Sequence, residues 1–194
     1  MEKLEALCRH AAQQAGADAS TAALLAQATA RAKSRGKTSV GLTHFFDYIH
    51  GLNTGAINCK AEPSVSTAGT ITRAIAHRNI PHRAFHQAVG RLSTTATRYG
   101  IGVLSISDAF TAGELGYYTA ELASRGLVGL AAANSSALVS IGESKKRILG
   151  TNPLSFAVPL KDRPLVIDRT ITPSALSPSE KRPRTTPLCR MEGH

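Results

Sequence analysis

The period of the hydrophobic pattern changes near residue 70, and this change limits the class of fold most strongly. Before it, apolar residues recur three and four positions apart, which is the spacing of helices with one buried face. After it, short apolar runs rich in β-branched residues alternate with helical stretches. We therefore predict an α+β fold, with N-terminal helices packed on a mixed sheet that has flanking helices.

Three helices are predicted before residue 55. Asp18 or Ser20 can cap the second of them, because either side chain can accept a hydrogen bond from an amide of the first turn. Residues 56–69 are expected to be loop, since they combine a proline with small polar residues. The first predicted helix spans about 1–15, the second runs from Thr21 through Ala32 and ends at Gly36, and the third spans about 43–52.

Strands and helices alternate in the second half of the chain. Pro81 suits the first turn of a helix that runs to Tyr99, and a further helix is expected at 113–124. The apolar run at 101–106 is expected to be a buried strand. The other predicted strands are 70–72, 127–133, 153–158 and 165–167. This organisation predicts a helical region at 1–66, an α/β cofactor-binding region at 67–168 and a basic, disordered tail at 169–194.

The net charge of +10 raises the question of nucleic-acid binding. Residues 169–194 supply +3 of it, from five basic and two acidic side chains, and the remaining excess is scattered. No stripe of Lys and Arg interleaved with aromatic residues is present in the sequence, so a nucleic-acid partner is disfavoured.

The cysteines and the apolar runs indicate the compartment. Cys8, Cys59 and Cys189 lie far apart and form no CxxC pair, which disfavours both a disulfide framework and a zinc site. A reducing compartment fits them best. Glu2 and Glu5 stand where a signal peptide would be basic, and the run 127–133 is too short to span a bilayer. We expect a soluble, cytoplasmic protein without a membrane partner.

Two further motifs are interpreted as structural. The glycines of Gly100-Ile101-Gly102 follow a helix and open a strand, which is the reverse of the order in a dinucleotide-binding fingerprint. His82 and His86 have a spacing that can bind a metal, but no third ligand lies nearby in the sequence. We expect them to be solvated surface histidines, and no metal site is predicted.

Three segments have both a structural and a functional interpretation. Ser39-Val40-Gly41-Leu42-Thr43-His44 is either a helix start or a site where helix amides and His44 face a ligand. Gly150-Thr151-Asn152-Pro153 is either a tight turn or a loop that binds a cofactor through its amides and Asn152. Asp168, at a strand end, is either a cap or a catalytic acid.

These segments belong to an ordered series of motifs along the chain. The motifs are Ser39-Val40-Gly41 with Tyr48 and Gly55, Tyr99 to Val103, Gly113 with Leu115 to Tyr118, Gly126 to Gly129, Asn134-Ser135, Gly150 to Leu154, and Pro164 to Asp168. Their order and spacing resemble one family, the malate/L-lactate dehydrogenase-type NAD(P)-dependent oxidoreductases, which are unrelated to the Rossmann-type enzymes. The Gly-Thr-Asn-Pro turn is the most specific of these motifs.

The resemblance implies a non-Rossmann fold, a homodimer, and hydride transfer from NAD or NADP to a small 2-oxo acid or a cyclic 2-imino acid. It places Gly150, Thr151, Asn152 and Pro153 in the cofactor-binding turn and Ser39 at the substrate. It also implies that Asp168 is the carboxylate that partners a catalytic histidine. Such a histidine can deliver the proton that must reach the oxygen or imine nitrogen of the substrate.

The chain departs from the family at the histidine itself. The usual pattern is Ser-His-Gly-x-x-Arg, whereas this chain has Val40 in place of the histidine and His44 in place of the arginine. Ala109 also stands where the family often has a further histidine. Two roles stay open for His44, which lies one helical turn past Val40: it replaces the lost acid, or it binds the substrate carboxylate.

Family members are substantially longer, and the motifs end just after Asp168. Residues 177–190 can be back-translated one nucleotide earlier into an Ala- and Glu-rich helix opening, which leads us to expect a frameshift and an activity impaired by truncation. Two alternatives to an impaired oxidoreductase stay open. One is a basic module that binds an acidic partner or nucleic acid, and the other is a non-catalytic remnant.

Overall fold

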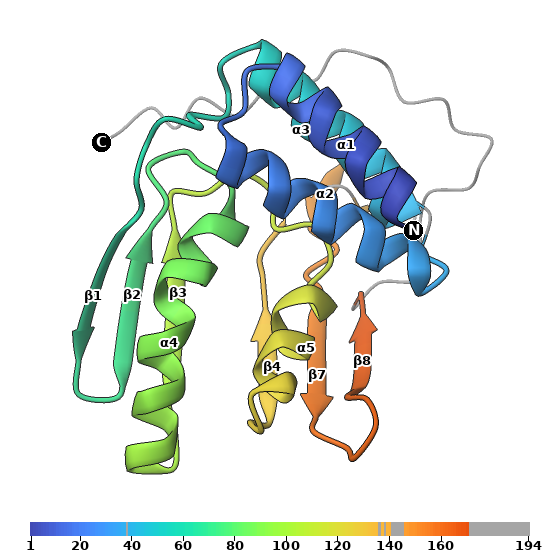
Figure 1. Cartoon of the computed structure of the whole chain (residues 1–194). Coiled ribbons are helices and arrows are strands. Elements are labelled where there is room, and N and C mark those ends of the chain that lie inside the picture. The colour runs from blue at the N-terminus through green and yellow to red at the C-terminus, as the bar shows by residue number, and fades with distance from the viewer. Residues whose placement is uncertain (38, 136, 138, 141–145, 171–194) are drawn as a thin grey trace.

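The computed structural model describes residues 1–37, 39–135, 137, 139–140 and 146–170 (Figure 1). Its helices are α1 (Glu2–Gln14), α2 (Ala19–Ser34), α3 (His44–Asn53), α4 (Pro81–Tyr99) and α5 (Gly116–Ser124), with a π-helical turn, η1, at Ser39–Thr43. Its strands are β1 (Ser64–Ala68), β2 (Ile71–Ile75), β3 (Val103–Ser107), β4 (Gly129–Ala132), β5 (Val139–Ser140), β6 (Arg147–Leu149), β7 (Leu154–Val158) and β8 (Leu165–Arg169).

The first three helices form a layer at one end of the strands (Figure 1). Asp18 is the N-cap of α2, and its Oδ1 atom accepts the amide of Thr21 at 2.7 Å. Small residues on α2 let the neighbouring helices approach closely, and Leu25 is fully buried between them. The predicted helices and the Asp18 cap are confirmed.

Two three-stranded sheets lie below this layer, each with one helix against it (Figure 1). In the first, β2 pairs antiparallel with β1 and parallel with β3, and α4 is the crossover between β2 and β3. In the second, β7 lies between β4 and β8 and pairs antiparallel with both, and α5 packs on it. The α+β class is therefore correct, and the strands are divided among small sheets.

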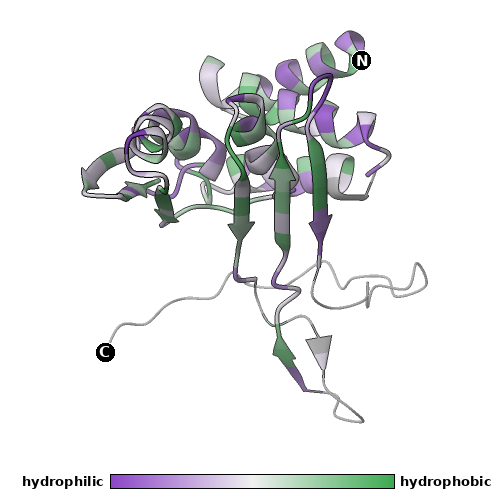
Figure 2. Ribbon diagram, turned by 90° about the horizontal axis from the view of Figure 1, so that it is seen from below, coloured by the Kyte–Doolittle hydropathy of each residue, from purple (hydrophilic) through white to green (hydrophobic). Residues whose placement is uncertain are grey.

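The sheet β4-β7-β8 has one covered and one open face. Ser155 and Ala157 of β7 are fully buried on the side of α5. Leu130, Phe156 and Ile167 lie side by side on the other face and are 67%, 37% and 50% exposed. The apolar character of these strands can be followed in Figure 2. The described part of the chain thus leaves an apolar sheet face in contact with solvent.

The strand predictions need three corrections. Residues 64–68, predicted to be loop, form the edge strand β1, whose side chains are mostly exposed. The run at 101–106 is only half-buried, because α4 covers one face of β3 and leaves Val103 47% exposed on the other. The short pair β5 and β6 was not predicted. The predicted tail lies outside the described residues from 171 onward, and the division at residue 66 stays a prediction.

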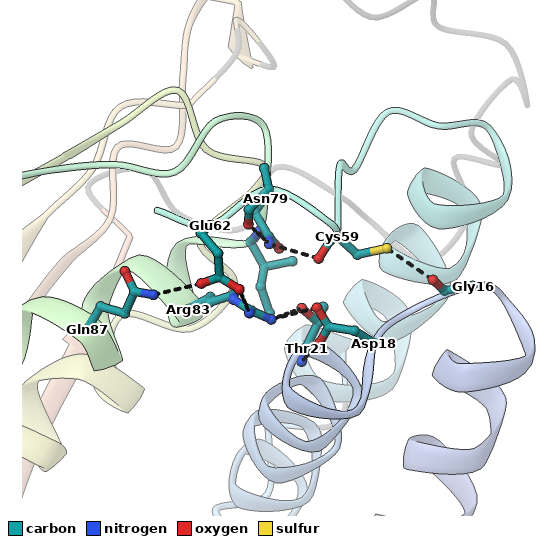
Figure 3. A network of polar contacts seen from close by, with 10 residues as sticks. Gly16, Asp18, Thr21, Cys59, Glu62, Asn79, Arg83 and Gln87 are labelled. Carbon is teal, nitrogen blue, oxygen red and sulfur yellow. Dashed lines mark hydrogen bonds and ion pairs between the residues drawn. The ribbon is translucent and has the colours of Figure 1, made fainter. Parts of the chain in front are cut away.

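A polar network around Arg83 ties the helical layer to α4 (Figure 3). Arg83 Nη1 donates to Asp18 Oδ2 at 2.6 Å, and Nη2 pairs with Glu62 Oε1. Gln87, one turn further along α4, donates to the other oxygen of Glu62 at 2.9 Å. The Arg83 side chain is only 12% exposed, whereas Asp18 and Glu62 are 37% and 64% exposed, so this guanidinium connects the N-terminus of α2 to the segment before β1 through carboxylates that water also reaches.

Replacing Arg83 by methionine is expected to lower the free energy of unfolding by about 1 kcal/mol, because two charge-assisted contacts with partly exposed carboxylates are lost. Urea unfolding followed by circular dichroism measures the change. Arg98→Met is the matched control, since Arg98 lies exposed near the end of the same helix and should change stability by less than about 0.5 kcal/mol. Equal losses in both variants would show that the network contributes nothing specific.

Candidate functional site

Two of the predicted site segments meet at one end of the sheet β4-β7-β8. The turn Gly150-Thr151-Asn152-Pro153 leads into β7, and Asp168 lies near the end of β8. Because β7 and β8 are antiparallel, with Ser155 opposite Asp168, the start of one strand lies beside the end of the other. The structure therefore brings the predicted cofactor turn and the predicted catalytic carboxylate to the same end of this sheet.

The turn before β7 is held by Ser135. The Ser135 hydroxyl accepts the amide of Thr151 at 2.6 Å, and the Ser135 amide donates to Asn152 Oδ1 at 3.2 Å. Asn152 has a φ of +36°, a left-handed conformation that asparagine tolerates better than most residues. At Gly150 any Cβ atom would collide with the carbonyl oxygen of Ser135, so only glycine fits. Ser135 belongs to one of the family motifs, but the sequence does not predict its contact with this turn.

Asp168 caps helix α5 and pairs with a lysine. Its Oδ2 atom accepts the amide of Gly116, the first residue of α5, at 3.0 Å and lies 3.1 Å from Lys37 Nζ. A carboxylate at a helix N-terminus is stabilised by the helix dipole as well as by the hydrogen bond. The family resemblance leads us to expect a histidine beside Asp168, whereas the structure places a lysine there.

A second carboxylate, Glu114, shares this lysine. Glu114 Oε1 lies 3.2 Å from Lys37 Nζ, and Glu114 Oε2 lies 2.6 Å from Arg35 Nη2. The side chains of Glu114 and Asp168 are only 5% and 9% exposed. Two cations and two carboxylates thus balance one another in a largely buried cluster, which we call the Lys37 cluster: Arg35, Lys37, Glu114 and Asp168. Only Asp168 of these four was predicted as a site residue.

His44 begins α3 and faces a small cavity. Its Nδ1 atom lies 3.4 Å from Asp47 Oδ2, one turn along the helix. The cavity has a volume of about 20 Å³, and His44, Tyr48, His82, Glu114 and Tyr117 are among its lining residues. Glu114 shares the cavity wall with His44 and also pairs with Lys37, which in turn pairs with Asp168.

His82 and His86 are not surface histidines, which corrects the prediction from sequence. His82 is 1% exposed and packs against Tyr48, Tyr117 and Tyr118. Burial, with a smaller contribution from His86, lowers the pKa of His82 to about 3, so this imidazole is neutral at physiological pH.

His86 is half-buried, and the same desolvation lowers its pKa. Its Nε2 atom lies 2.7 Å from the Tyr117 hydroxyl, which in turn donates to Gln27. Among the described residues, no group of three or more His, Cys, Asp or Glu side chains could hold a metal ion.

Ser39 and Val40 lie in the π-helical turn that precedes α3. His44 follows this turn as the first residue of α3. The roles predicted for Ser39, His44, Asp168 and the turn 150–153 stay predictions.

Within the described ranges, no helix is long and apolar enough to cross a membrane.

Comparisons with known proteins identify what this chain resembles. A family model described as malate/L-lactate dehydrogenase matches residues 1–183, which extends past Asp168, where the sequence motifs end. The malate dehydrogenase of Pyrococcus horikoshii is 29% identical over 152 residues, covering 76% of this chain and 41% of that protein. The (2R)-3-sulfolactate dehydrogenase (NADP(+)) of Chromohalobacter salexigens is 28% identical over 173 residues, covering 89% of this chain and 52% of that protein.

Solved structures agree with this similarity. A malate dehydrogenase structure from Pyrococcus horikoshii has a TM-score of 0.80 at 25% identity and covers 87% of this chain and 49% of that chain. The structure of delta1-piperideine-2-carboxylate reductase from Pseudomonas syringae has a TM-score of 0.79 at 28% identity, with coverages of 86% and 51%. The chain spans about half the length of the curated relatives it matches.

Proposed function

The chain belongs to the malate/L-lactate dehydrogenase family, and we propose from this premise that it interconverts a small 2-hydroxy acid and a 2-oxo acid, or reduces a cyclic 2-imino acid, with NAD or NADP. The names of its relatives support both substrate classes, since they include a sulfolactate dehydrogenase and a piperideine-carboxylate reductase. Because the chain spans about half the length of these relatives, this activity is a proposal for the chain itself.

One observation carries the proposal: the buried carboxylates Asp168 and Glu114 share Lys37, and Glu114 also lines the cavity of His44. Hydride transfer to a carbonyl or imine carbon leaves an oxygen or nitrogen that must gain a proton. His44 is the imidazole of this cavity that is not fully buried, and imidazole is the side chain most often used for proton transfer in catalysis, so His44 is the proposed proton donor. Lys37, held by two carboxylates, would stabilise the developing negative charge.

The turn before β7 fits a nicotinamide cofactor. Ser135 already fixes the backbone of Thr151 and the Oδ1 atom of Asn152. Because Ser135 holds Oδ1, the side-chain Nδ2 atom of Asn152 would donate to a phosphate or carboxamide of the cofactor. When bound, the cofactor would supply or accept the hydride. The roles of the chain are then to hold the cofactor at 150–153 and to place a proton near it.

We further propose a homodimer and a cytoplasmic location. The dimer is implied by the family resemblance. The location is supported by two free thiols among the described residues, at Cys8 and Cys59, because such thiols persist in a reducing compartment.

A non-catalytic member of the family is the second candidate function. It is favoured by Val40 and Ala109, which stand where the family pattern has histidines. Oxidation of NADH and NADPH with pyruvate and with a cyclic imino acid separates the two candidates. Turnover supports the oxidoreductase, cofactor binding without turnover supports the non-catalytic member, and neither binding nor turnover would contradict both.

Replacing Asn152 by alanine is expected to weaken NADPH binding about tenfold, because the amide donor is lost and alanine is strained at a positive φ. Fluorescence of bound NADPH measures the affinity. Asn152→Gly keeps the backbone conformation and removes only the side chain, and Asn53→Ala, at the exposed end of α3, is the neutral control. Equal affinity in the Asn152 variants and the control would remove Asn152 from the site.

A further inference from the structure

The cavity beside His44 has room for one water molecule and carries polar groups on part of its wall. It lies among α2, α3, α4 and the segment before α5, and its volume is about 20 Å³. A water molecule needs about 10–15 Å³ of this kind of space and two to four polar partners. The ionisable side chains on its wall are His44, His82, Glu114 and the phenols Tyr48 and Tyr117.

His82 is the clearest sign that the cavity holds a polar ligand. Its ring is 1% exposed, and its Nδ1 atom has no hydrogen-bond partner among the described residues. A neutral imidazole has one donor nitrogen and one acceptor nitrogen, and a buried nitrogen without a partner is destabilising. Three tyrosine rings surround this histidine, so the side that faces the cavity is where a partner can reach it.

Glu114 offers an acceptor on the same wall. Its Oε2 atom is bound by Arg35 at 2.6 Å. Its Oε1 atom lies 3.2 Å from Lys37 Nζ but makes no well-directed hydrogen bond within the described part of the chain, and it is fully buried. A carboxylate oxygen can accept more than one hydrogen bond, so Oε1 can also accept one from a water molecule.

We propose that this cavity binds one ordered water molecule and that His82 Nδ1 and Glu114 Oε1 are its protein partners. A metal ion is disfavoured, because the described residues hold no cluster of three metal-binding side chains. The consequence for catalysis rests on the proposed function: the water would lie between His44 and the Lys37 cluster and join the two parts of the candidate site. His82 and Glu114 are then positioning residues.

A crystal structure of the full chain at high resolution tests the site directly. We expect a water molecule within hydrogen-bond distance of both His82 Nδ1 and Glu114 Oε1. A cavity without density for a bound molecule, or density that contacts neither atom, would overturn the proposal. This test requires no variant to fold.

Two variants give a second test through the sign of a melting-temperature change. His82→Phe removes one partner of the water, and Ala28→Val places methyl groups in the cavity. Each is expected to lower the melting temperature by about 4 °C if it displaces a bonded water. If the cavity is dry, the same changes remove an unpaired polar atom or fill a void, and the melting temperature should rise.

His50→Phe and Ala19→Val are the controls, since both residues are exposed on α3 and α2. A rise in both cavity variants relative to these controls would overturn the proposal. None of these measurements depends on turnover. An inactive chain with an ordered water would therefore contradict the proposed function alone, and an active chain with a dry cavity would contradict this inference alone.

Discussion

Replacing Asp168 by asparagine is expected to lower the turnover of a 2-oxo or imino acid at least about 100-fold. Asparagine keeps the volume and one oxygen that can accept from Gly116, but it removes the charge that holds Lys37. Loss of a group that organises proton delivery typically reduces the rate by about 10² to 10⁴. The effect should fall on kcat more than on KM, because the cluster acts where charge develops in the transition state.

The measurement is NADPH oxidation at saturating substrate, expressed relative to the rate of the unchanged chain. Asp162→Asn is the matched control, because Asp162 lies exposed in the turn between β7 and β8. Its rate should equal that of the unchanged chain. If Asp168→Asn also retains full turnover, Asp168 is only the cap of α5 and takes no part in the reaction.

The stability of the fold is expected to decrease as the pH falls below about 6.5, and His82 should account for about 3 kcal/mol of this loss by pH 4.5. The pKa of this buried imidazole is lowered from 6.5 to about 3 in the folded state. Between these two values the unfolded chain binds a proton that the folded chain does not. Each unit by which the pH falls in that window therefore lowers the free energy of unfolding by about 1.4 kcal/mol. His86 acts in the same direction, since its pKa is also lowered.

Urea unfolding at a series of pH values tests this dependence. In His82→Phe the curve of stability against pH should be flatter between pH 6.5 and 4.5, whatever the stability at neutral pH. The carboxylates contribute equally to both proteins, so the difference between the two curves isolates the histidine. Parallel curves would show that His82 is solvated in the folded state.

The helices could be predicted well because their signals are local. Pro81 at the first turn and the end at Tyr99 gave the bounds of α4, and Asp18 caps α2 as its position suggests. The strand β1 could not be found in this way. Its residues, Ser64–Ala68, are small and polar because it is an exposed edge strand, so its sequence carries little hydrophobic signal.

The candidate site could be predicted only in part, for a reason of chain distance. Asp168 and Asn152 stand next to strand ends, and local sequence is enough to notice them. Lys37 lies 131 residues from Asp168 along the chain, and no local spacing predicts that contact. The burial of His82 was missed for the same reason, because the tyrosines that enclose it come from α3 and α5, which are distant from His82 along the chain.

The open face of β4-β7-β8 governs how this chain behaves in concentrated solution. The exposed apolar patch on this face consists of Leu130, Phe156 and Ile167 and can associate with the same patch of another copy. The net charge of +10 opposes this association, because two copies of like charge repel each other. That repulsion reaches about 30 Å at 0.01 M ionic strength but only about 8 Å at 0.15 M. Added salt therefore weakens the electrostatic repulsion between two copies and strengthens the hydrophobic attraction between their apolar patches. For the described part of the chain, colloidal stability is greatest in dilute buffer and declines as salt approaches the physiological range.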